Sequence, residues 1–271
     1  MIFENSNTSE YTMTIMISNT ITSSSNEKIK FLRKLGQKKY RDDSGMFYVE
    51  NLKTICDAFD SGYIFDSLFI TQDIYEKEAQ LLKPILNNSQ AVFIINEQIN
   101  KSFSFLDTPS GICAVYKKSI KKIDLSKSVI YLNSINDPGN LGTILRTALA
   151  FDFCNIVIDE TSVDLYNPKT LGAAKDAVFK LNIELDDNQF LLKKIKTDMP
   201  IYATRLTDAI ELSELNPPDL FCIVFGNEAL GISESTSKLA DQFIGIRMNK
   251  QMESLNVAIT ASIMLYRLRK N

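Results

Sequence analysis

Three short segments of this 271-residue chain combine glycine with small polar residues, and each follows an apolar run. They are residues 133–146, 225–231 and 254–257. In an open α/β sheet, loops of this composition at the carboxyl ends of strands bring the backbone close to a ligand. The three segments are therefore candidate ligand-binding loops of an α/β sheet.

The first segment predicts a turn at the N-terminus of a helix. Asp137, Pro138 and Gly139 form the turn, the helix is expected to open at or just after Asn140, and Arg146 follows less than two turns later. Such a turn binds anions, because unpaired backbone N–H groups point outward there. Taken alone, the segment also fits a helix cap at Asn140 and a surface arginine. Neither G-x-G-x-x-G nor the Walker loop is present, which disfavours an NAD- or ATP-dependent enzyme.

The second and third segments add candidate polar groups. A buried strand is expected to end at Gly226, where the missing side chain lets a ligand approach the backbone. Glu228 is then either a ligand acceptor or a charge at a helix terminus. Ser254 is the expected N-cap of a long apolar helix. One stripe of that helix is expected to pack on the core or on a second subunit: Val257, Ala261, Ile263, Met264 and Leu268.

The composition limits which groups can do the chemistry. The chain contains no histidine, so a general base has to be Asp, Glu, Lys, Tyr, Cys or a less usual group. The four cysteines are far apart and form no C-x-x-C pair, which excludes the common zinc sites, and no metal is expected. Cys222 lies within an apolar run and is expected to be a buried structural thiol.

One segment near the N-terminus is strongly basic, although the net charge is −3 and argues against indiscriminate nucleic-acid binding. The apolar residues Ile29, Leu32 and Leu35 recur within it at helical spacing. One face can therefore dock on a core while the other meets RNA phosphates, and a solvated helix face is the alternative. The candidate RNA-binding residues are Lys28, Lys30, Arg33, Lys34, Lys38, Lys39 and Arg41.

Alternating helical and strand-like patterns predict an α/β protein of two domains. We expect a mobile extension at 1–26, a small α/β domain at 27–118, a linker at 119–127 and a larger domain at 128–271. Strands separated by helices in the larger domain predict a mostly parallel sheet with helices on both faces. The apolar runs are too short to cross a bilayer, so a soluble, cytoplasmic protein with no membrane contact is expected.

The expected elements are as follows. Strands are predicted at 46–50, 64–70, 91–95, 112–116, 129–133, 155–158, 180–184, 200–204, 220–225 and 243–247. Helices are predicted at 27–40, 52–60, 73–86, 96–102, 140–151, 167–177, 188–197, 235–240 and 254–269.

Taken together, the three segments resemble the motifs of a known family. They read Asn-x-x-Asn-Asp-Pro-x-Asn-x-Gly-x-x-x-Arg, Gly-Asn-Glu-x-x-Gly and Ile-x-Met-x(5)-Ser-Leu-Asn-Val. These patterns resemble those of the SpoU/TrmH family of the SPOUT class, which are S-adenosylmethionine-dependent RNA ribose 2′-O-methyltransferases. The lysine-rich helix and the Gly-x-Phe-x-x-Glu of 45–50 resemble the family's small substrate-binding domain.

The resemblance implies a fold and a set of site residues. It implies a C-terminal trefoil knot, an exception to the rule that chains are unknotted, and a homodimer with the site near the interface. The residues implied for binding of the methyl donor are Gly226, Asn227, Ile246, Met248 and Leu255. The residues implied for catalysis are Asn140, Arg146, Glu228, Ser254 and Asn256.

The resemblance makes the arginine of the first motif central. A guanidinium stays protonated and is a poor general base, so Arg146 is expected to grip the phosphate beside the target ribose. The two-domain layout favours ribosomal RNA over transfer RNA by analogy. Four residues depart from the family pattern and keep a catalytically inactive RNA-binding assembly factor as an alternative: Gly172, Ala229, Arg247 and Lys250.

Overall fold

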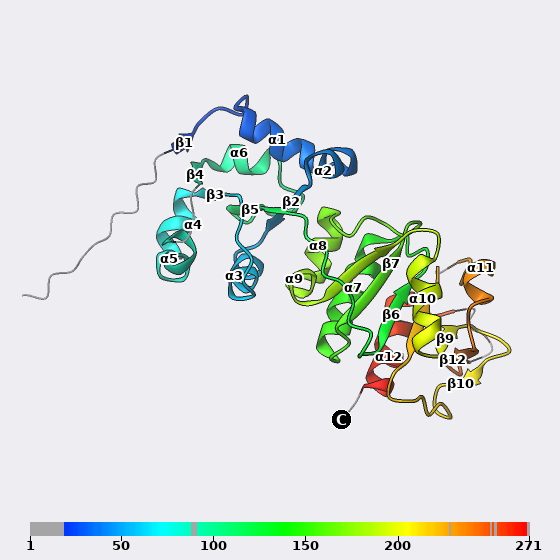
Figure 1. Ribbon diagram of the computed structural model, residues 1–271. Coiled ribbons are helices and arrows are strands. Elements are labelled where there is room, and N and C mark those ends of the chain that lie inside the picture. The colour runs from blue at the N-terminus through cyan, green and yellow to red at the C-terminus, as the bar shows by residue number, and fades with distance from the viewer. Residues whose placement is uncertain (1–18, 88–90, 228, 250, 252–253, 270–271) are drawn as a thin grey trace, which may run out of the picture.

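The computed structural model describes residues 19–87, 91–227, 229–249, 251 and 254–269, and it contains two α/β domains in sequence (Figure 1). Each domain is built on one sheet, with strand orders β1-β4-β3-β5-β2 and β10-β12-β9-β11-β6-β7-β8. The predicted α/β class is therefore confirmed. None of the helices in these described ranges is long and apolar enough to cross a membrane.

The N-terminal sheet is mixed. β1, β4 and β3 pair in parallel, whereas β5 pairs antiparallel with both β3 and β2. Its strands are β1 (Asn19–Ile21), β2 (Met46–Glu50), β3 (Ser67–Thr71), β4 (Val92–Ile95) and β5 (Ile112–Lys117). The helices around it are α1 (Glu27–Leu35), α2 (Lys38–Ser44), α3 (Leu52–Asp60), α4 (Gln72–Lys77), α5 (Ala79–Asn87) and α6 (Glu97–Lys101).

Three predictions for this domain need correction. The predicted helix 73–86 is two helices, α4 and α5, with Glu78 between them. The mobile extension is predicted to reach residue 26, but β1 belongs to the sheet and its Ile21 is buried. Residues 1–18 lie outside the described part of the chain. An edge strand of three residues in a Ser/Thr-rich stretch is too short to show an alternating pattern. The predicted helix 27–40 is two helices, because Gln37 between them has extended backbone angles.

The C-terminal sheet is parallel at every pairing described. Its strands are β6 (Val129–Leu132), β7 (Asn155–Asp159), β8 (Asn182–Asp186), β9 (Ile201–Thr204), β10 (Ile210–Glu211), β11 (Cys222–Phe225) and β12 (Gln242–Gly245). The helices are α7 (Pro138–Ala150), α8 (Pro168–Ala174), α9 (Ala177–Lys180), α10 (Phe190–Asp198), α11 (Glu234–Ser237) and α12 (Val257–Leu268). β10 was not predicted, because two residues carry no periodic signal.

Helices cover both faces of this sheet, as predicted. Ile130 faces the cluster that contains residues of α7 and α12, whereas its neighbour Val129 faces α10. All four residues of β6 and of β11 are buried, which is the pattern of strands covered on both sides. The carboxyl ends of these strands point to one edge of the domain, and the loops of interest begin there.

The two site helices begin at positions other than those predicted. α7 begins at Pro138, and the side chain of Asp137 accepts a hydrogen bond from the Asn140 backbone N–H at 2.8 Å. Proline suits the first helical position because no N–H is left unpaired there. α12 is capped by Asn256, so the predicted cap at Ser254 is wrong.

Most of the predicted α12 stripe is buried within its own chain. Val257, Ala261, Met264 and Leu268 belong to the core cluster, whereas Ile263 is 40% exposed. Four of these five residues therefore pack on the core of their own chain and not on a second subunit.

The two domains meet through buried aromatic rings and one ion pair. Phe47 from β2 lies 4.5 Å from Tyr166 and 6.2 Å from Phe179, measured between ring centroids. Arg41 donates to one carboxylate oxygen of Asp164 from Nε at 2.9 Å and from Nη2 at 2.5 Å, and Nη1 donates to the Leu35 carbonyl at 2.7 Å. An apolar junction of this kind holds two domains in one orientation.

The predicted RNA contact of Arg41 is therefore wrong. Its side chain is only 3% exposed, and its guanidinium donates to Asp164 and to the Leu35 carbonyl inside the protein. The pattern of basic residues along the helix could not reveal this, because the carboxylate that holds the guanidinium is 123 positions away.

We expect Asp164→Ala to lower the free energy of unfolding by about 3 kcal/mol, because it leaves the Arg41 charge buried without a partner. Asp42→Ala removes the carboxylate of a more exposed pair with Lys118, at 2.6 Å, and should cost less than about 1 kcal/mol. Urea unfolding of both variants and the wild type measures the difference, and equal losses would contradict this account.

Candidate active site

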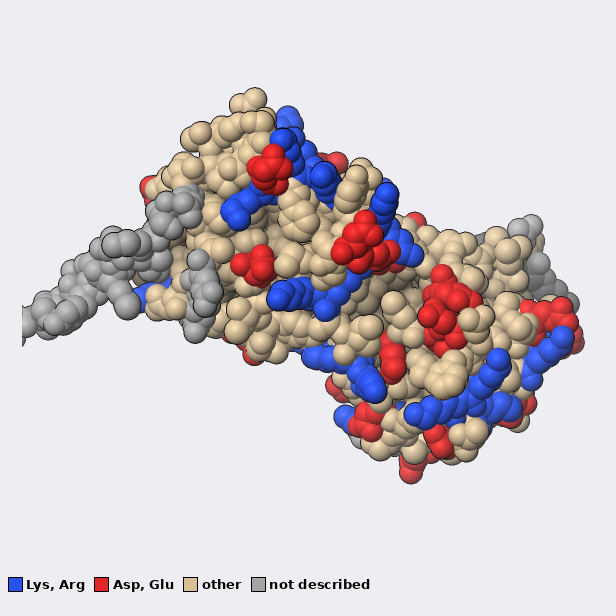
Figure 2. Space-filling model, turned by 45° about the horizontal axis from the view of Figure 1, so that its top comes forward, with Lys and Arg blue, Asp and Glu red and all other residues tan. Residues whose placement is uncertain are grey.

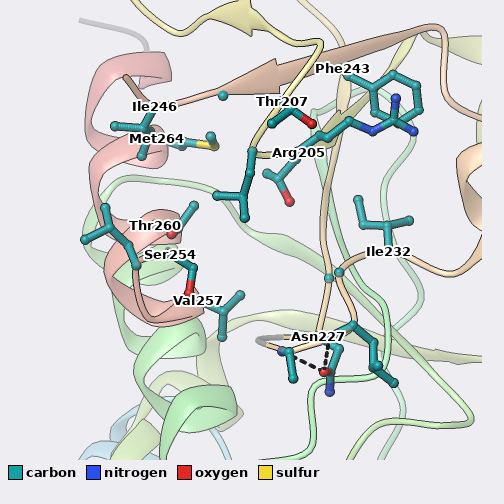
Figure 3. Close-up of a pocket in the computed structure, with 18 of the residues that line it drawn as sticks. Arg205, Thr207, Asn227, Ile232, Phe243, Ile246, Ser254, Val257, Thr260 and Met264 are labelled. Atoms are coloured by element: carbon teal, nitrogen blue, oxygen red, sulfur yellow. Dashed lines mark hydrogen bonds between the residues drawn. The ribbon is translucent and has the colours of Figure 1, made fainter. Parts of the chain in front are cut away.

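One pocket of about 400 Å³ lies at the carboxyl ends of β9, β11 and β12, beside the start of α12 (Figure 3). Residues of the second and third segments meet there, although about twenty-five positions separate them in sequence. The predicted donor-binding residues all line it: Gly226, Asn227, Ile246, Met248 and Leu255. Ser254, predicted as catalytic, lines the same pocket.

A tight loop after β11 forms one wall. The Asn227 side-chain oxygen accepts hydrogen bonds from the N–H groups of Ala229 and Leu230, both at 2.9 Å. The backbones of Asn227 and Gly231 exchange two further bonds at 2.9 Å, and Gly231 has a φ of +70°. A short polar side chain at the start and a glycine at the end close this loop on itself.

Gly226 also has a structural role in the pocket wall. A Cβ added there would lie 2.6 Å from the Gly231 carbonyl carbon and 2.6 Å from Ile232 Cγ1. The missing side chain therefore makes room for the loop's own returning backbone, and the pocket wall depends on that approach.

The opposite wall contains residues that sequence reasoning missed. The guanidinium carbon of Arg205 lies 3.3 Å from the centroid of the Phe243 ring, so the cation lies over the ring. Thr204 and Thr207 flank Arg205, and Thr260 and Met264 of α12 complete this side. The strand before Thr204 was predicted, but nothing local indicates that its end adjoins β11 and β12.

The structure describes four of the five candidate catalytic residues. Ser254 lies in the pocket, whereas Asn140 and Asn256 are joined by a hydrogen bond of 3.0 Å from Asn256 Nδ2 to Asn140 Oδ1. Arg146 is exposed on α7 and is not among the described residues that line the pocket. Glu228 lies outside the described residues.

Asn256 connects the first and third segments. Its side-chain oxygen caps α12 by accepting from the N–H groups of Ala258 at 2.8 Å and Ile259 at 3.3 Å, which leaves its amide nitrogen for Asn140. Further along, the hydroxyls of Thr147 on α7 and Ser262 on α12 lie 3.3 Å apart. The two helices are thus linked at their N-termini and again near mid-length.

The basic residues of α1 and α2 lie on the other domain. Six of the seven are exposed: Lys28, Lys30, Arg33, Lys34, Lys38 and Lys39. Figure 2 shows lysine and arginine side chains gathered over these helices, with some acidic residues among them. Lys30 is paired with Glu27 at 2.7 Å, so part of this surface is locally neutralised.

The buried thiols are structural. Burial raises the pKa of the Cys113 thiol and that of the Cys222 thiol, so both stay protonated near neutral pH. Cys222 is fully buried in β11, as its apolar run predicted. Neither is a nucleophile in its present surroundings.

Comparisons with known proteins divide the chain into two parts that correspond to the two domains of the structure. Residues 127–266 match the model of the SpoU rRNA Methylase family, and residues 26–114 match that of the MRM3-like substrate binding domain. The chain is 27% identical over 250 residues to the 23S rRNA (guanosine(2553)-2′-O)-methyltransferase RlmP of Bacillus subtilis (strain 168), covering 92% of this chain and 98% of that relative.

Solved structures of RNA methyltransferases share this fold. The AdoMet-bound rRNA methyltransferase from Sinorhizobium meliloti matches with a TM-score of 0.82 and 25% identity, over 92% of this chain and 96% of that chain. The SpoU methyltransferase AviRb from Streptomyces viridochromogenes, 18% identical over 89% of this chain and 96% of that one, shares the fold with a TM-score of 0.81. The chain belongs to the SpoU rRNA methylase family.

Proposed function

We propose that this protein transfers a methyl group from S-adenosylmethionine to a ribose 2′-hydroxyl of ribosomal RNA. The observation that carries the proposal is the pocket: residues 226–227, 246–248 and 254–255 meet around it, and they include all five predicted donor-binding residues. The names of the Bacillus and Sinorhizobium proteins support the donor and the class of RNA. We keep the cytoplasm as the proposed compartment.

The pocket residues fit the proposed donor. S-adenosylmethionine, when bound, supplies an electrophilic methyl group on a sulfonium and presents both apolar and polar parts to the protein. Ile246, Leu255 and Met264 offer apolar surface, while Asn227 and Thr260 offer polar groups. A concave site with a few polar groups among apolar ones is typical for a ligand of this size.

Among the residues proposed to act on RNA, Asn140 and Arg146 lie on α7 and Asn256 caps α12. Arg146 is proposed to bind the phosphate next to the target ribose, because its planar fork matches two phosphate oxygens. Ser254 at the pocket wall, the linked pair Asn140 and Asn256, and Glu228 remain proposed catalytic residues. Positioning and charge stabilisation by such groups supply much of a methyl transferase's rate without a histidine.

The N-terminal domain is proposed to hold the RNA through the exposed cations of α1 and α2. Both domains are shared with the Bacillus relative, since the match covers 98% of it, and this favours ribosomal over transfer RNA. Transfer RNA remains the alternative substrate because some relatives are named as tRNA/rRNA methyltransferases.

A homodimer is proposed through the exposed side of α12. Ile259, Ile263 and Tyr266 recur at helical spacing and are 51%, 40% and 56% exposed, which is unusual for a cluster of large apolar residues. α12 packs beside α7, which carries Arg146, so a partner on this face would complete the site. The trefoil knot is also proposed, and the insertion of β12 between the earlier strands β9 and β10 supports it.

Methyl transfer to RNA tests the proposed reaction. Labelled donor should modify unmodified ribosomal RNA in preference to transfer RNA, and Arg146→Ala should lower the rate by about 100-fold because it removes a charged contact to the reacting region. Arg146→Lys should recover part of the rate, since it restores the charge without the fork. Calorimetric titration should give the same donor affinity for all three proteins.

Failure to methylate any fraction of total RNA, with donor binding demonstrated, would contradict the reaction and favour an RNA-binding assembly factor. Absence of donor binding would contradict the pocket assignment itself.

We expect Gly226→Ala to weaken donor binding by more than about tenfold, because a methyl group there forces the loop backbone away from β11 by overpacking. Gly172→Ala is the matched control: Gly172 is also in the C-terminal domain, but an added Cβ would have nothing within 4 Å. Titration with S-adenosylmethionine checks both variants. Equal affinity for the two would show that the loop tolerates displacement.

We expect Ile263→Glu to convert the dimer to a monomer, because it places a charge in the proposed apolar interface. Phe190→Glu, at a residue that is 71% exposed on α10, is the control and should leave the mass unchanged. Light scattering after size exclusion measures the mass of each protein. A monomeric wild type, or a dimer that survives Ile263→Glu, would contradict the assignment.

A further inference from the structure

The loop between α6 and β5 presents a large aromatic ring to solvent. Phe105 is 51% exposed, and the adjacent Leu106 is 39% exposed. Both follow the buried Phe103, whose ring lies edge-on to Tyr48 at 6.2 Å between centroids. The exposed Phe105 ring thus lies next to buried aromatic packing. Neither the pocket nor the basic residues of α1 and α2 explain why this ring is exposed.

Phe105 is held by contacts from two parts of the fold, the junction between α1 and α2 and the strand β2. A Cβ added at Gly36, between α1 and α2, would lie 2.5 Å from Phe105 Cζ, so the ring edge packs directly against that backbone. The Phe105 N–H donates to Glu50 Oε1 at 2.9 Å. The Tyr48 ring centroid is 6.3 Å away. The ring is therefore pre-positioned and loses little rotamer freedom when a ligand covers it.

Cationic side chains belong to the same α1–α2 junction that the ring packs against. Arg33 lies one turn before Gly36, and its Nη2 donates to Ser102 Oγ at 3.0 Å, three residues before Phe105. Lys34 lies over the Tyr40 ring, 5.5 Å from its centroid, on the following helix. The half-exposed ring and these cations are thus both anchored at the α1–α2 junction.

We propose that Phe105 is a stacking platform for an unpaired base of the RNA, with the neighbouring phosphates held by Arg33 and the cations of α1. Proteins bind single-stranded RNA by this combination of base stacking on an aromatic ring and charge contacts to the backbone. A duplex keeps its base faces stacked internally and offers nothing to the ring. The inference rests on the proposed RNA substrate and does not depend on methyl transfer.

A fluorescence experiment tests it directly, because the chain contains no tryptophan. Phe105→Trp introduces a single indole at the platform, and Phe190→Trp introduces one at a comparably exposed site of the other domain. Single-stranded oligouridine should quench the emission of the first variant, whereas a duplex of equal length should quench it weakly. The second variant should respond to neither RNA.

Affinity measurements on full-length variants complete the test. Phe105→Ala should bind oligouridine about tenfold more weakly than wild type, and Phe105→Tyr, which keeps the ring and its packing on Gly36, should stay within about twofold. Arg33→Ala should reduce the slope of log affinity against log salt by about one. The midpoint of thermal unfolding confirms that each variant is folded.

Equal quenching by duplex and single strand, or unchanged affinity in Phe105→Ala, would overturn the platform. Because binding is read without methyl donor, a protein that binds but does not methylate would contradict the proposed reaction while leaving this inference intact.

Discussion

The parallel pairing of β9, β11 and β12 is the constraint on which the site depends. Strands that run in one direction bring their carboxyl ends to the same edge of the sheet, so the loops that follow them must meet there. Thr204, Gly226 and Ile246 therefore converge on one pocket together with residues that follow them. Burial of β11 and β6 on both faces keeps the edge in place, since a shift in register would expose apolar side chains.

Close approaches of backbone at glycine shape both proposed binding surfaces. Gly226 lets the loop of residues 226–231 fold back on β11, and Gly36 lets the Phe105 ring lie against the α1–α2 junction. In each case the absence of a side chain leaves room for another part of the protein, and that part faces the proposed ligand. Glycines in functional segments can therefore serve the ligand indirectly, by allowing the wall that contacts it.

The junction between the domains fixes the position of the donor pocket relative to the Phe105 surface. Phe47, Tyr166 and Phe179 belong to one hydrophobic cluster that continues across the boundary, and the buried pair of Arg41 and Asp164 adds a directional contact. Because α8 follows Asp164 and packs on α7, the orientation of the basic helices is tied to the helix that carries Arg146. An RNA bound by one domain would thus meet the other at a set distance.

The sequence by itself determined the alternation of elements and one part of the pocket lining. The apolar runs predicted β2 and α3 at their observed bounds, and the motif resemblance selected Gly226, Ile246 and Leu255. Only the tertiary structure decided which charges are free and which residues become neighbours. Arg41 is buried by a carboxylate 123 positions away, and Arg205 lies over the ring of Phe243 because β9 and β12 pair. Local periodicity reports which face of an element is apolar, whereas these contacts depend on chain segments that meet only after folding.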